Sequence, residues 1–474
     1  MKTLLVFPRV GAIKPHSSPP LGTAQIAANM RSRNLDVRLA DLTFSTWEDY
    51  IQILKRYDPD IVGVSTLSLY EEEALMVGAL AHAYNQDILT VYGGVHPTIN
   101  SQEMILRPEA DIICVGEADN TLPEIVEALQ RDRVVDTIKG IWHTLDGHPI
   151  YTGDRPLIED LDSLPFPARD LLPMKQYLKR PPTPILPSPS AGFVFMRGCP
   201  YNCSFCQPTS KMMWGMKQRK VSPERAIREI VEVNDEYNLW SVNFHDDTFT
   251  VDKKWVSRFS HLLQKENLGL DSIINSRVNL VNDKILGELK DMGVVQIIFG
   301  VESGSNRVLD EILDKGITTD MVEKAFKLCH SHDIMARANI MLGSPTETVD
   351  EMRLTRRLLT RIKPDAVIVS ITCPMEGTYL YDRAKEQGLL GEHSATTFSK
   401  GVLKGVDYEV LDKQMTSIKK EMLHMWWTDP IFLLSYNRWR AILKRTYTQF
   451  RDGNIRSAGG AMLQLATYME SKVQ

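Results

Sequence analysis

The stretch Phe195-Met-Arg-Gly-Cys-Pro-Tyr-Asn-Cys-Ser-Phe-Cys206 decides the fold of this chain, because it carries Cys199, Cys203 and Cys206 in one short loop. Three thiolates so close together repel one another unless a soft metal binds them, and thiolates favour zinc or iron–sulfur clusters. A structural zinc site uses four ligands, usually two Cys-x2-Cys pairs or one such pair with two histidines. No second pair lies nearby. The spacing therefore favours a four-iron cluster with one open iron over a zinc site or a disulfide.

The bulk composition indicates a soluble intracellular enzyme, and we expect a cytoplasmic one. The 474 residues allow two or three domains, and the chain has six cysteines, 43% apolar residues and a formal charge of −5. Nucleic-acid binders normally carry a basic face, so we expect no nucleic-acid partner. The apolar start of the chain ends at Pro8, too early for a signal peptide, and no run of about twenty apolar residues predicts a membrane span.

The region 1–130 alternates short apolar strands with amphipathic helices, a pattern typical of a Rossmann-like, doubly wound parallel α/β sheet. The expected strands are Leu4–Phe7, Val37–Ala40, Ile61–Ser65, Ile88–Tyr92 and Ile112–Val115, and the expected helices lie near Gly22–Arg33, Thr46–Arg56, Glu71–Asn85 and Leu122–Gln130. Ligands of such sheets bind at the carboxyl ends of the strands. Loops of glycine and other small residues follow these strands: Pro19-Pro-Leu-Gly22, Ser65-Thr-Leu-Ser68, Gly93-Gly-Val-His-Pro-Thr98 and Gly116-Glu117.

A proline-rich connector follows at 131–190. Asp146-Gly147 predicts a small hairpin, and Leu161–Pro173 contains too many prolines for a helix or a central strand. We expect an extended strap between two domains there, with Pro181–Pro189 as a surface loop.

The region 191–390 contains six β/α units and predicts a partial (β/α)6 barrel, followed by a mostly helical C-terminal region at 391–474. The expected strands are Phe193–Met196, Ser241–His245, Ser272–Asn275, Gln296–Gly300, Ala336–Leu342 and Ala366–Ile371, and the expected terminal helices are Lys413–Trp427 and Leu433–Arg451. Active residues of such barrels lie at the carboxyl ends of the strands. The three-cysteine loop follows the first strand, and polar motifs follow the others: His245-Asp-Asp-Thr-Phe249, Asn275-Ser-Arg277, Gly300-Val-Glu-Ser-Gly304 and Gly343-Ser-Pro-Thr-Glu347.

The cysteine spacing with Phe205 before the last cysteine resembles the signature of radical S-adenosylmethionine (SAM) enzymes. With the glycine loops of the first region ahead of it, the chain resembles the cobalamin-dependent radical SAM methyltransferases. The resemblance implies a [4Fe-4S] cluster on Cys199, Cys203 and Cys206. It implies that SAM contacts Phe205, Asp246, Asp247, Arg277, Glu302, Ser303 and Gly343. It implies that cobalamin contacts Pro20, Gly22, Ser65, Thr66, Ser68, Gly93, Gly94, His96, Thr98, Gly116 and Glu117.

Two of these assignments also have physical reasons. A carboxylate such as Glu302 can accept hydrogen bonds from both ribose hydroxyls. Adjacent acids on a strand point to opposite faces, so only one of Asp246 and Asp247 is expected to face a ligand. The alternative for Glu302 is a solvated or salt-bridged surface acid.

The chain lacks the Asp-x-His-x-x-Gly motif by which many cobalamin proteins supply a histidine to cobalt. His16 and, less favourably, His96 are the alternatives as axial ligands. We expect a cobalt without a strong lower protein ligand, which suits a methyl carrier.

The family chemistry implies methylation of an unactivated carbon through a 5′-deoxyadenosyl radical and methylcobalamin, with a ferredoxin- or flavodoxin-type electron donor as partner. The narrower resemblance is to methanogen enzymes that methylate a glutamine of methyl-coenzyme M reductase, a protein substrate. A ring-forming cyclase, or a methylase of a small molecule or lipid, uses the same cofactors and stays open. A methylthiotransferase needs three more cysteines in the first region, which contains only Cys114. Cys114, Cys329 and Cys373 are expected to be small buried residues.

Overall fold

The computed structural model describes residues 1–9, 18–179, 183, 185–206, 208–391, 403–433, 435, 438–440, 443 and 447. The chain forms two compact units. Unit 1 contains Met1–Tyr177, Arg197–Pro200 and Thr209–Val221, and unit 2 contains Leu178–Met196, Tyr201–Pro208 and the residues from Ser222 onward. The three-cysteine loop is therefore divided between the two units: Cys199 belongs to unit 1, and Cys203 and Cys206 belong to unit 2.

Unit 1 is built on a seven-stranded sheet of order β2-β1-β3-β4-β5-β6-β7 among the described residues. Its strands are β1 (Lys2–Phe7), β2 (Asp36–Asp41), β3 (Ile61–Ser65), β4 (Leu89–Gly93), β5 (Ile112–Cys114), β6 (Ile141–Leu145) and β7 (His148–Tyr151). The first five are parallel and agree with the five predicted strands to within about two residues, so the doubly wound α/β sheet is confirmed. β6 and β7 add an antiparallel edge.

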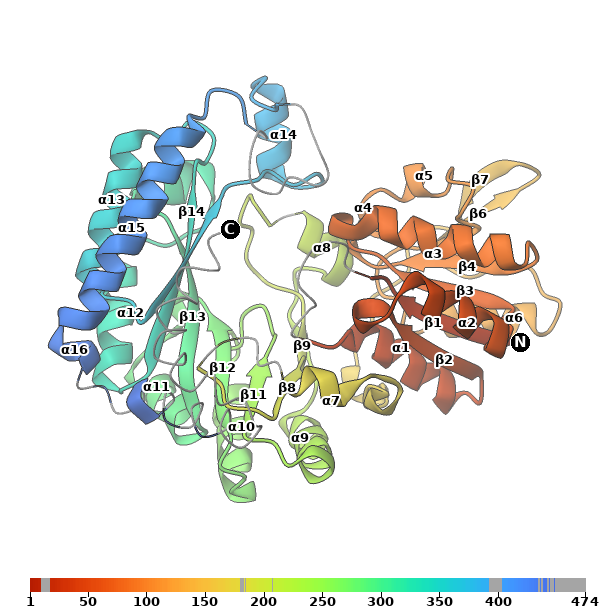
Figure 1. Ribbon diagram of the computed structural model, residues 1–474, viewed down its shortest axis with the longest axis horizontal. Coiled ribbons are helices and arrows are strands. Elements are labelled where there is room, and N and C mark those ends of the chain that lie inside the picture. The colour runs from red at the N-terminus through yellow and green to blue at the C-terminus, as the bar shows by residue number, and fades with distance from the viewer. Residues whose placement is uncertain are drawn as a thin grey trace. The chain divides into compact units, whose positions relative to one another are not determined.

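Helices cover both faces of this sheet (Figure 1). The helices described in unit 1 are α1 (Leu21–Ser32), α2 (Trp47–Tyr57), α3 (Glu71–Tyr84), α4 (Val95–Ile99), α5 (Ser101–Met104), α6 (Thr121–Leu129), α7 (Met174–Tyr177) and α8 (Thr209–Trp214). The apolar sides of α2 and α3 form the core on one face, and those of α1 and α6 form the core on the other. α2 begins at a capping box between Thr46 and Asp49, which satisfies exposed backbone N–H groups at its start.

The first part of the expected connector packs on unit 1. Asp146 and Gly147 both adopt positive φ in the turn between β6 and β7, as the predicted hairpin requires. The Tyr177 hydroxyl donates a 2.5 Å hydrogen bond to Asp41, and the Ala168 N–H donates to the Ala24 carbonyl. Residues 131–177 thus belong to the same compact unit as the sheet.

In the described part of unit 2, six parallel strands lie in the order β15-β14-β13-β12-β11-β8, which confirms the partial barrel. They are β8 (Ser190–Phe193), β11 (Ser241–Phe244), β12 (Asp271–Ser276), β13 (Val294–Glu302), β14 (Met335–Leu342) and β15 (Ala366–Ile371). The prediction of Phe193–Met196 as the first strand was wrong by three residues: β8 ends at Phe193, and Met196–Arg197 is a separate short strand, β9. The two-residue strand β10 (Arg219–Lys220) lies in unit 1.

The helices of unit 2 are α9 (Pro223–Tyr237), α10 (Lys253–Glu266), α11 (Asp283–Asp291), α12 (Thr319–Ser331), α13 (Val349–Ile362), α14 (Tyr379–Glu386), α15 (Tyr408–Thr428) and α16 (Pro430–Leu433). α15 contains the predicted helix Lys413–Trp427 and packs beside α13 (Figure 1). Trp426 is buried there and donates its indole N–H to the Pro364 carbonyl. Most of the predicted helix Leu433–Arg451 lies outside the described residues. No helix in the described ranges is both long enough and apolar enough to cross a membrane.

Candidate cofactor sites

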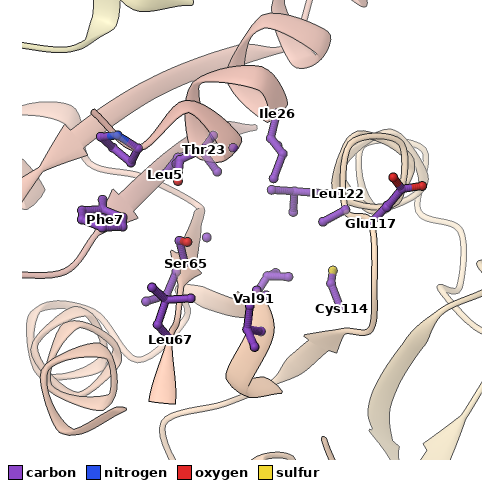
Figure 2. Close-up of a pocket in the computed structure, with 18 of the residues that line it drawn as sticks. Leu5, Phe7, Thr23, Ile26, Ser65, Leu67, Val91, Cys114, Glu117 and Leu122 are labelled. Carbon is purple, nitrogen blue, oxygen red and sulfur yellow. The ribbon is translucent and has the colours of Figure 1, made fainter. Parts of the chain in front are cut away.

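A pocket of about 280 Å³ opens at the carboxyl edge of the unit 1 sheet. The strand order places β1 beside both β2 and β3, and the crossovers from β1 change direction at this point. Open parallel sheets bind ligands at such a switch point, where two loops diverge and leave a crevice. Figure 2 shows side chains from β1, β4, α1 and α6 pointing into the pocket.

Seven of the residues predicted to contact cobalamin line this pocket. They are Pro20, Gly22, Ser65, Gly93, Gly94, Gly116 and Glu117. The sequence analysis missed its apolar wall, which includes Leu5, Phe7, Ile26, Val91, Cys114, Leu122, Met213 and Trp214. A signal for Ile26 and Leu122 exists in the apolar faces of their helices, but Met213 and Trp214 come from a distant segment and only the fold brings them here. Burial raises the pKa of the Cys114 thiol to about 12, so it acts as an apolar wall residue.

The backbone conformation at position 94 requires a glycine. It has φ +108°, and a Cβ there would lie 2.7 Å from the Thr66 carbonyl oxygen. At Gly93 a Cβ would meet only Cys114, at an ordinary 3.6 Å. Gly94 therefore has a local structural reason: it permits the β3 and β4 loops to touch.

Four other predicted cobalamin residues do not line the pocket but hold its loops. The Thr98 hydroxyl donates to the Gly94 carbonyl at 2.7 Å and accepts from the Gly116 N–H at 3.0 Å. His96 is buried, with its ring nitrogens 3.1 Å from the Ser68 hydroxyl and 3.4 Å from Glu71. Thr66 is buried and its N–H donates to Gly93. His16, the other histidine considered for cobalt, lies outside the described residues.

Glu117 is at the rim of the pocket, and its carboxylate is already bound by other protein groups. Arg219 donates to both carboxylate oxygens of Glu117 at 2.9 Å. Arg197 donates to Oε1 and the Ile158 N–H donates to Oε2, each at 2.9 Å. The residue therefore has a clear structural function within unit 1, and its predicted contact with cobalamin stays a prediction.

In unit 2, Arg277 reaches the cysteine loop. Its Nη1 donates to the Cys203 sulfur at 3.3 Å, its Nη2 donates to the Lys315 carbonyl, and its guanidinium lies 3.8 Å from the centre of the Tyr201 ring. Arg277 and Cys203 are both buried. Hydrogen bonds to the ligand sulfurs are a usual feature of iron–sulfur cluster sites. This arrangement fits a cluster ligand at Cys203.

Glu302 and Lys315 form a buried ion pair at the end of β13, with Lys315 Nζ 2.9 Å from Glu302 Oε1. Gly300 leaves room for the pair, because a Cβ there would lie 2.4 Å from Glu302 and 2.7 Å from Lys315. Lys315 also lies 5.3 Å from the centre of the Phe205 ring. Glu302 adopts φ +62°, a conformation unfavourable for a residue with a side chain and common at ligand sites. The sequence analysis missed Lys315, whose surroundings in the chain carry no motif.

Asp246 and Asp247 lie beyond the end of β11 and differ in burial: Asp246 is buried and Asp247 is exposed. Asp246 Oδ1 accepts from the Phe195 and Met196 N–H groups at 2.7 and 2.6 Å, and its other oxygen has no partner among the described residues. Burial raises the pKa of Asp246 to about 7, more than the two N–H groups lower it. Asp246 therefore fixes the chain that enters the cysteine loop.

Ser303 and Gly343 are also committed to the fold. The Ser303 hydroxyl accepts from the Ser305 N–H and lies 3.4 Å from the Thr355 hydroxyl. Gly343 has φ +78°, and its N–H and that of Ser344 both donate to Glu347 Oε2. Burial raises the pKa of Glu347 to about 7. SAM contacts by either residue stay predictions.

The described part of the chain contains no ready-made group of three His, Cys, Asp or Glu side chains around a metal position. Iron ligation by Cys199, Cys203 and Cys206 is therefore still a prediction. Cys329 is buried as expected, whereas Cys373 is only partly buried beyond the end of β15.

Known proteins resemble both halves of this arrangement. Residues 14–126 match the model of the B12 binding domain, and residues 193–359 match that of the radical SAM superfamily. An uncharacterized methyltransferase of Pyrococcus horikoshii is 35% identical over 401 residues, 82% of this chain and 84% of the relative. The anaerobic magnesium-protoporphyrin IX monomethyl ester cyclase of Rubrivivax gelatinosus is 25% identical over 441 residues, 89% of this chain and 77% of the relative.

Among solved structures, the radical SAM methyltransferase TsrM from Kitasatospora setae, with cobalamin and a [4Fe-4S] cluster bound, superposes with a TM-score of 0.69. Its identity is 15%, and the match covers 83% of this chain and 76% of that one. At that identity the likeness concerns the fold.

Proposed function

Because this chain belongs to the cobalamin-dependent radical SAM methyltransferases, we propose that it methylates an unactivated carbon of its substrate. It is an enzyme of the [4Fe-4S], SAM and cobalamin class. The observation that carries the proposal is the pairing, in one chain, of an apolar switch-point pocket with a barrel edge where an arginine reaches a cluster-loop cysteine. Such a pair of sites suits a reaction that needs a methyl carrier and a radical initiator.

The pocket of unit 1 suits one end of the cobalamin molecule. A pocket of about 280 Å³ is too small for a whole corrin ring, but its apolar walls suit the flat nucleotide base of the cofactor. We propose that Gly22, Ser65 and Gly116 face this group, and that the corrin lies outside the pocket. When bound, cobalamin supplies a transferable methyl group and the cluster with SAM supplies a substrate-activating radical.

The chain's own residues hold and polarise these groups. Arg277 donates a hydrogen bond to the Cys203 sulfur, and the Lys315–Glu302 pair presents a fixed positive and a fixed negative charge at the barrel edge. SAM carries an amino group, a carboxylate and two ribose hydroxyls, so we propose that it binds beside this pair. Both charges are buried, which strengthens their effect because water screens them little.

The narrower proposal is that the acceptor is a glutamine of a protein, of the kind methylated in methyl-coenzyme M reductase. Its support is the sequence resemblance to that group of methylases. A flavodoxin- or ferredoxin-type electron donor belongs to the same proposal, since reduction of the cluster needs a low-potential electron. A cytoplasmic location is also part of this proposal.

The second candidate is a ring-forming reaction, favoured by the relative from Rubrivivax gelatinosus, which is named as a cyclase and covers 89% of this chain. A product mass separates the two reactions. Anaerobically reconstituted protein should be incubated with SAM, cobalamin, a low-potential reductant and a candidate glutamine peptide, with d3-methyl SAM in parallel. We expect a product heavier by one CH₂ unit that carries the deuterium label. A product that loses hydrogen without gaining carbon would contradict methylation and support the cyclase.

A further inference from the structure

A buried network of four charged residues ties the cobalamin pocket to the start of the cluster loop. Arg197 donates to Asp119 through both Nη atoms at 2.9 Å and to Glu117 at 2.9 Å. Arg219 donates to both oxygens of Glu117 at 2.9 Å. Two carboxylates face two guanidinium groups, so the network is neutral. All four residues lie in unit 1.

The network is unusual in its burial. The side chains of Glu117, Arg219 and Asp119 are 3%, 2% and 7% exposed, and that of Arg197 is 16% exposed. Charged pairs removed from water gain little stability over apolar residues of the same size, because desolvation offsets their attraction. Such a network does, however, permit few geometries, because Arg197 meets Asp119 through both Nη atoms while both arginines share the Glu117 carboxylate. It specifies where its residues lie.

One side of the network reaches the cobalamin pocket. Glu117 lines the pocket, and Arg219 Nη2 donates to the carbonyl of Trp214, which lines it too. The Arg197 guanidinium lies 5.5 Å from the centre of the Trp214 ring. A change in the position of either arginine therefore moves a wall of the pocket.

The other side reaches the first cluster cysteine through the chain itself. Arg197 is followed by Gly198 and Cys199. Gly198 has φ +89°, and a Cβ there would lie 2.6 Å from the Lys217 carbonyl and 3.0 Å from those of Trp214 and Gly215. The backbone that carries Cys199 thus packs tightly on the segment that forms the pocket wall. Binding of Cys199 to iron would fix Arg197, and with it Glu117 and Trp214.

We propose that the Glu117–Arg197–Arg219–Asp119 network couples cobalamin binding to assembly of the iron–sulfur cluster. Each binding event favours the same arrangement of these residues, so the first event makes that arrangement more populated for the second. Glu117 and Asp119 are positioning residues in this scheme and act through Arg197. The inference rests on the proposed placement of cobalamin in the unit 1 pocket.

Linkage provides the test, because coupling is reciprocal and measurable as a ratio of affinities. The dissociation constant of hydroxocobalamin should be measured by equilibrium dialysis for the full chain with and without its cluster. We expect cobalamin to bind at least about fivefold more tightly to the cluster-loaded protein, within the usual range of coupling factors. Reciprocally, cobalamin should slow the loss of iron to a chelator.

Asp119→Asn is the main variant, because Asp119 binds Arg197 and does not line the pocket. We expect it to bring the affinity ratio close to one while the cluster-free protein still binds cobalamin. Glu124→Gln is the matched control: Glu124 also forms a two-bond pair with an arginine of unit 1, Arg155, at 2.6 and 2.7 Å, and that pair is separate from the network. Its ratio should stay at the wild-type value.

Three results would overturn the proposal. A wild-type ratio of one would show that the sites are not coupled. An unchanged ratio in Asp119→Asn would show that the network does not carry the coupling. If Asp119→Asn weakened cobalamin binding equally with and without the cluster, Asp119 would have only a structural role. Loss of cobalamin binding in the wild-type protein itself would instead contradict the proposed site.

Discussion

The two parallel sheets of this protein present very different edges. At the carboxyl edge of the unit 1 sheet, glycines and apolar side chains surround a pocket, and the charged group at its rim is neutralised by arginines. At the carboxyl edge of the barrel, buried charges stand at the strand ends, with Asp246, Arg277, Glu302 and Lys315 as the main ones. The same topology thus supports two kinds of recognition. The first suits a large cofactor held by shape, and the second a small charged molecule held by ion pairs and hydrogen bonds.

The largest effect is expected from Cys203→Ala at the barrel edge. Loss of one of three thiolates leaves the cluster without a stable set of ligands, so its visible absorption and the formation of 5′-deoxyadenosine should both disappear. Cys329→Ala, which removes a buried thiol from α12, should keep both signals. The cluster assignment would fail if a triple alanine variant at Cys199, Cys203 and Cys206 still cleaved SAM reductively.

Lys315→Met tests whether the charges at this edge depend on one another. It leaves Glu302 buried without its cation, so we expect the free energy of unfolding to fall by about 3 to 5 kcal/mol. SAM affinity, measured by calorimetry, should fall as well. Adding Glu302→Gln should restore part of the stability but not the SAM affinity. The exposed pair Arg361–Glu323 supplies the control, since Arg361→Met should change stability little.

Glu347→Gln tests the effect of a buried acid through pH. Burial raises the folded-state pKa of Glu347 from 4.5 to about 7. Between these two pH values the Glu347 carboxyl is therefore protonated in the folded protein and ionised in the unfolded chain. The contribution of this difference to the free energy of unfolding is fully present below pH 4.5 and is lost as the pH rises through about 7. By linkage the loss amounts to at most about 3 kcal/mol.

Denaturant unfolding at pH 5 and pH 8 measures this effect. The decrease in stability between the two pH values should be smaller in Glu347→Gln than in the wild-type protein. Glu351→Gln is the control: Arg307 lowers the pKa of Glu351 to about 2, so the stabilisation by Glu351 is lost only as the pH falls below 4.5. The decrease in stability between pH 5 and pH 8 should therefore stay at the wild-type value in Glu351→Gln. An equal pH dependence in Glu347→Gln and wild type would contradict the buried-acid interpretation.

Gly22→Leu tests recognition by shape at the unit 1 edge. Gly22 lines the pocket, and a Cβ there meets nothing within 4 Å, so the new side chain can enter the empty space without strain. Cobalamin affinity should fall about tenfold, equivalent to about 1.4 kcal/mol. Stability should be unchanged or slightly higher, because leucine favours a helix more than glycine does. Gly287→Leu in α11 gives a control with equal free space outside the pocket. Unchanged cobalamin binding in Gly22→Leu would argue against this pocket as the site.

The smallest effect is expected from Cys373→Ala. The thiol lies beyond β15 at the barrel edge, and partial burial raises its pKa, so it has little thiolate character. Transfer of a methyl group to a substrate radical needs no hydrogen atom from the protein. Methylation should therefore continue, with a stability change of about 1 kcal/mol or less. Normal 5′-deoxyadenosine formation without methylated product would place Cys373 in the chemistry.

Most of the fold was predictable because the signals that determine it are local. Branched residues in short runs mark the strands, and caps such as Thr46 and Ser222 mark helix starts. The error at the first barrel strand arose because Phe193, Phe195 and Met196 form one apolar run, although the backbone turns within it. The N–H groups of Phe195 and Met196 donate to the Asp246 carboxylate, which lies about fifty positions away in the chain. A local pattern does not reveal such a partner.

The sequence by itself determined the cysteine loop, the two parallel sheets and the strand ends at which the polar motifs lie, since spacing and periodicity are properties of the chain. Only the tertiary structure decided which of those residues face a ligand and which are bound by other protein groups. Glu117 and Ser303 follow strands in the predicted way, yet their polar atoms contact other residues of the fold. Lys315, Met213 and Trp214 join the sites without any local signal. Side-chain direction and distant contacts arise from packing in three dimensions, which a one-dimensional pattern does not encode.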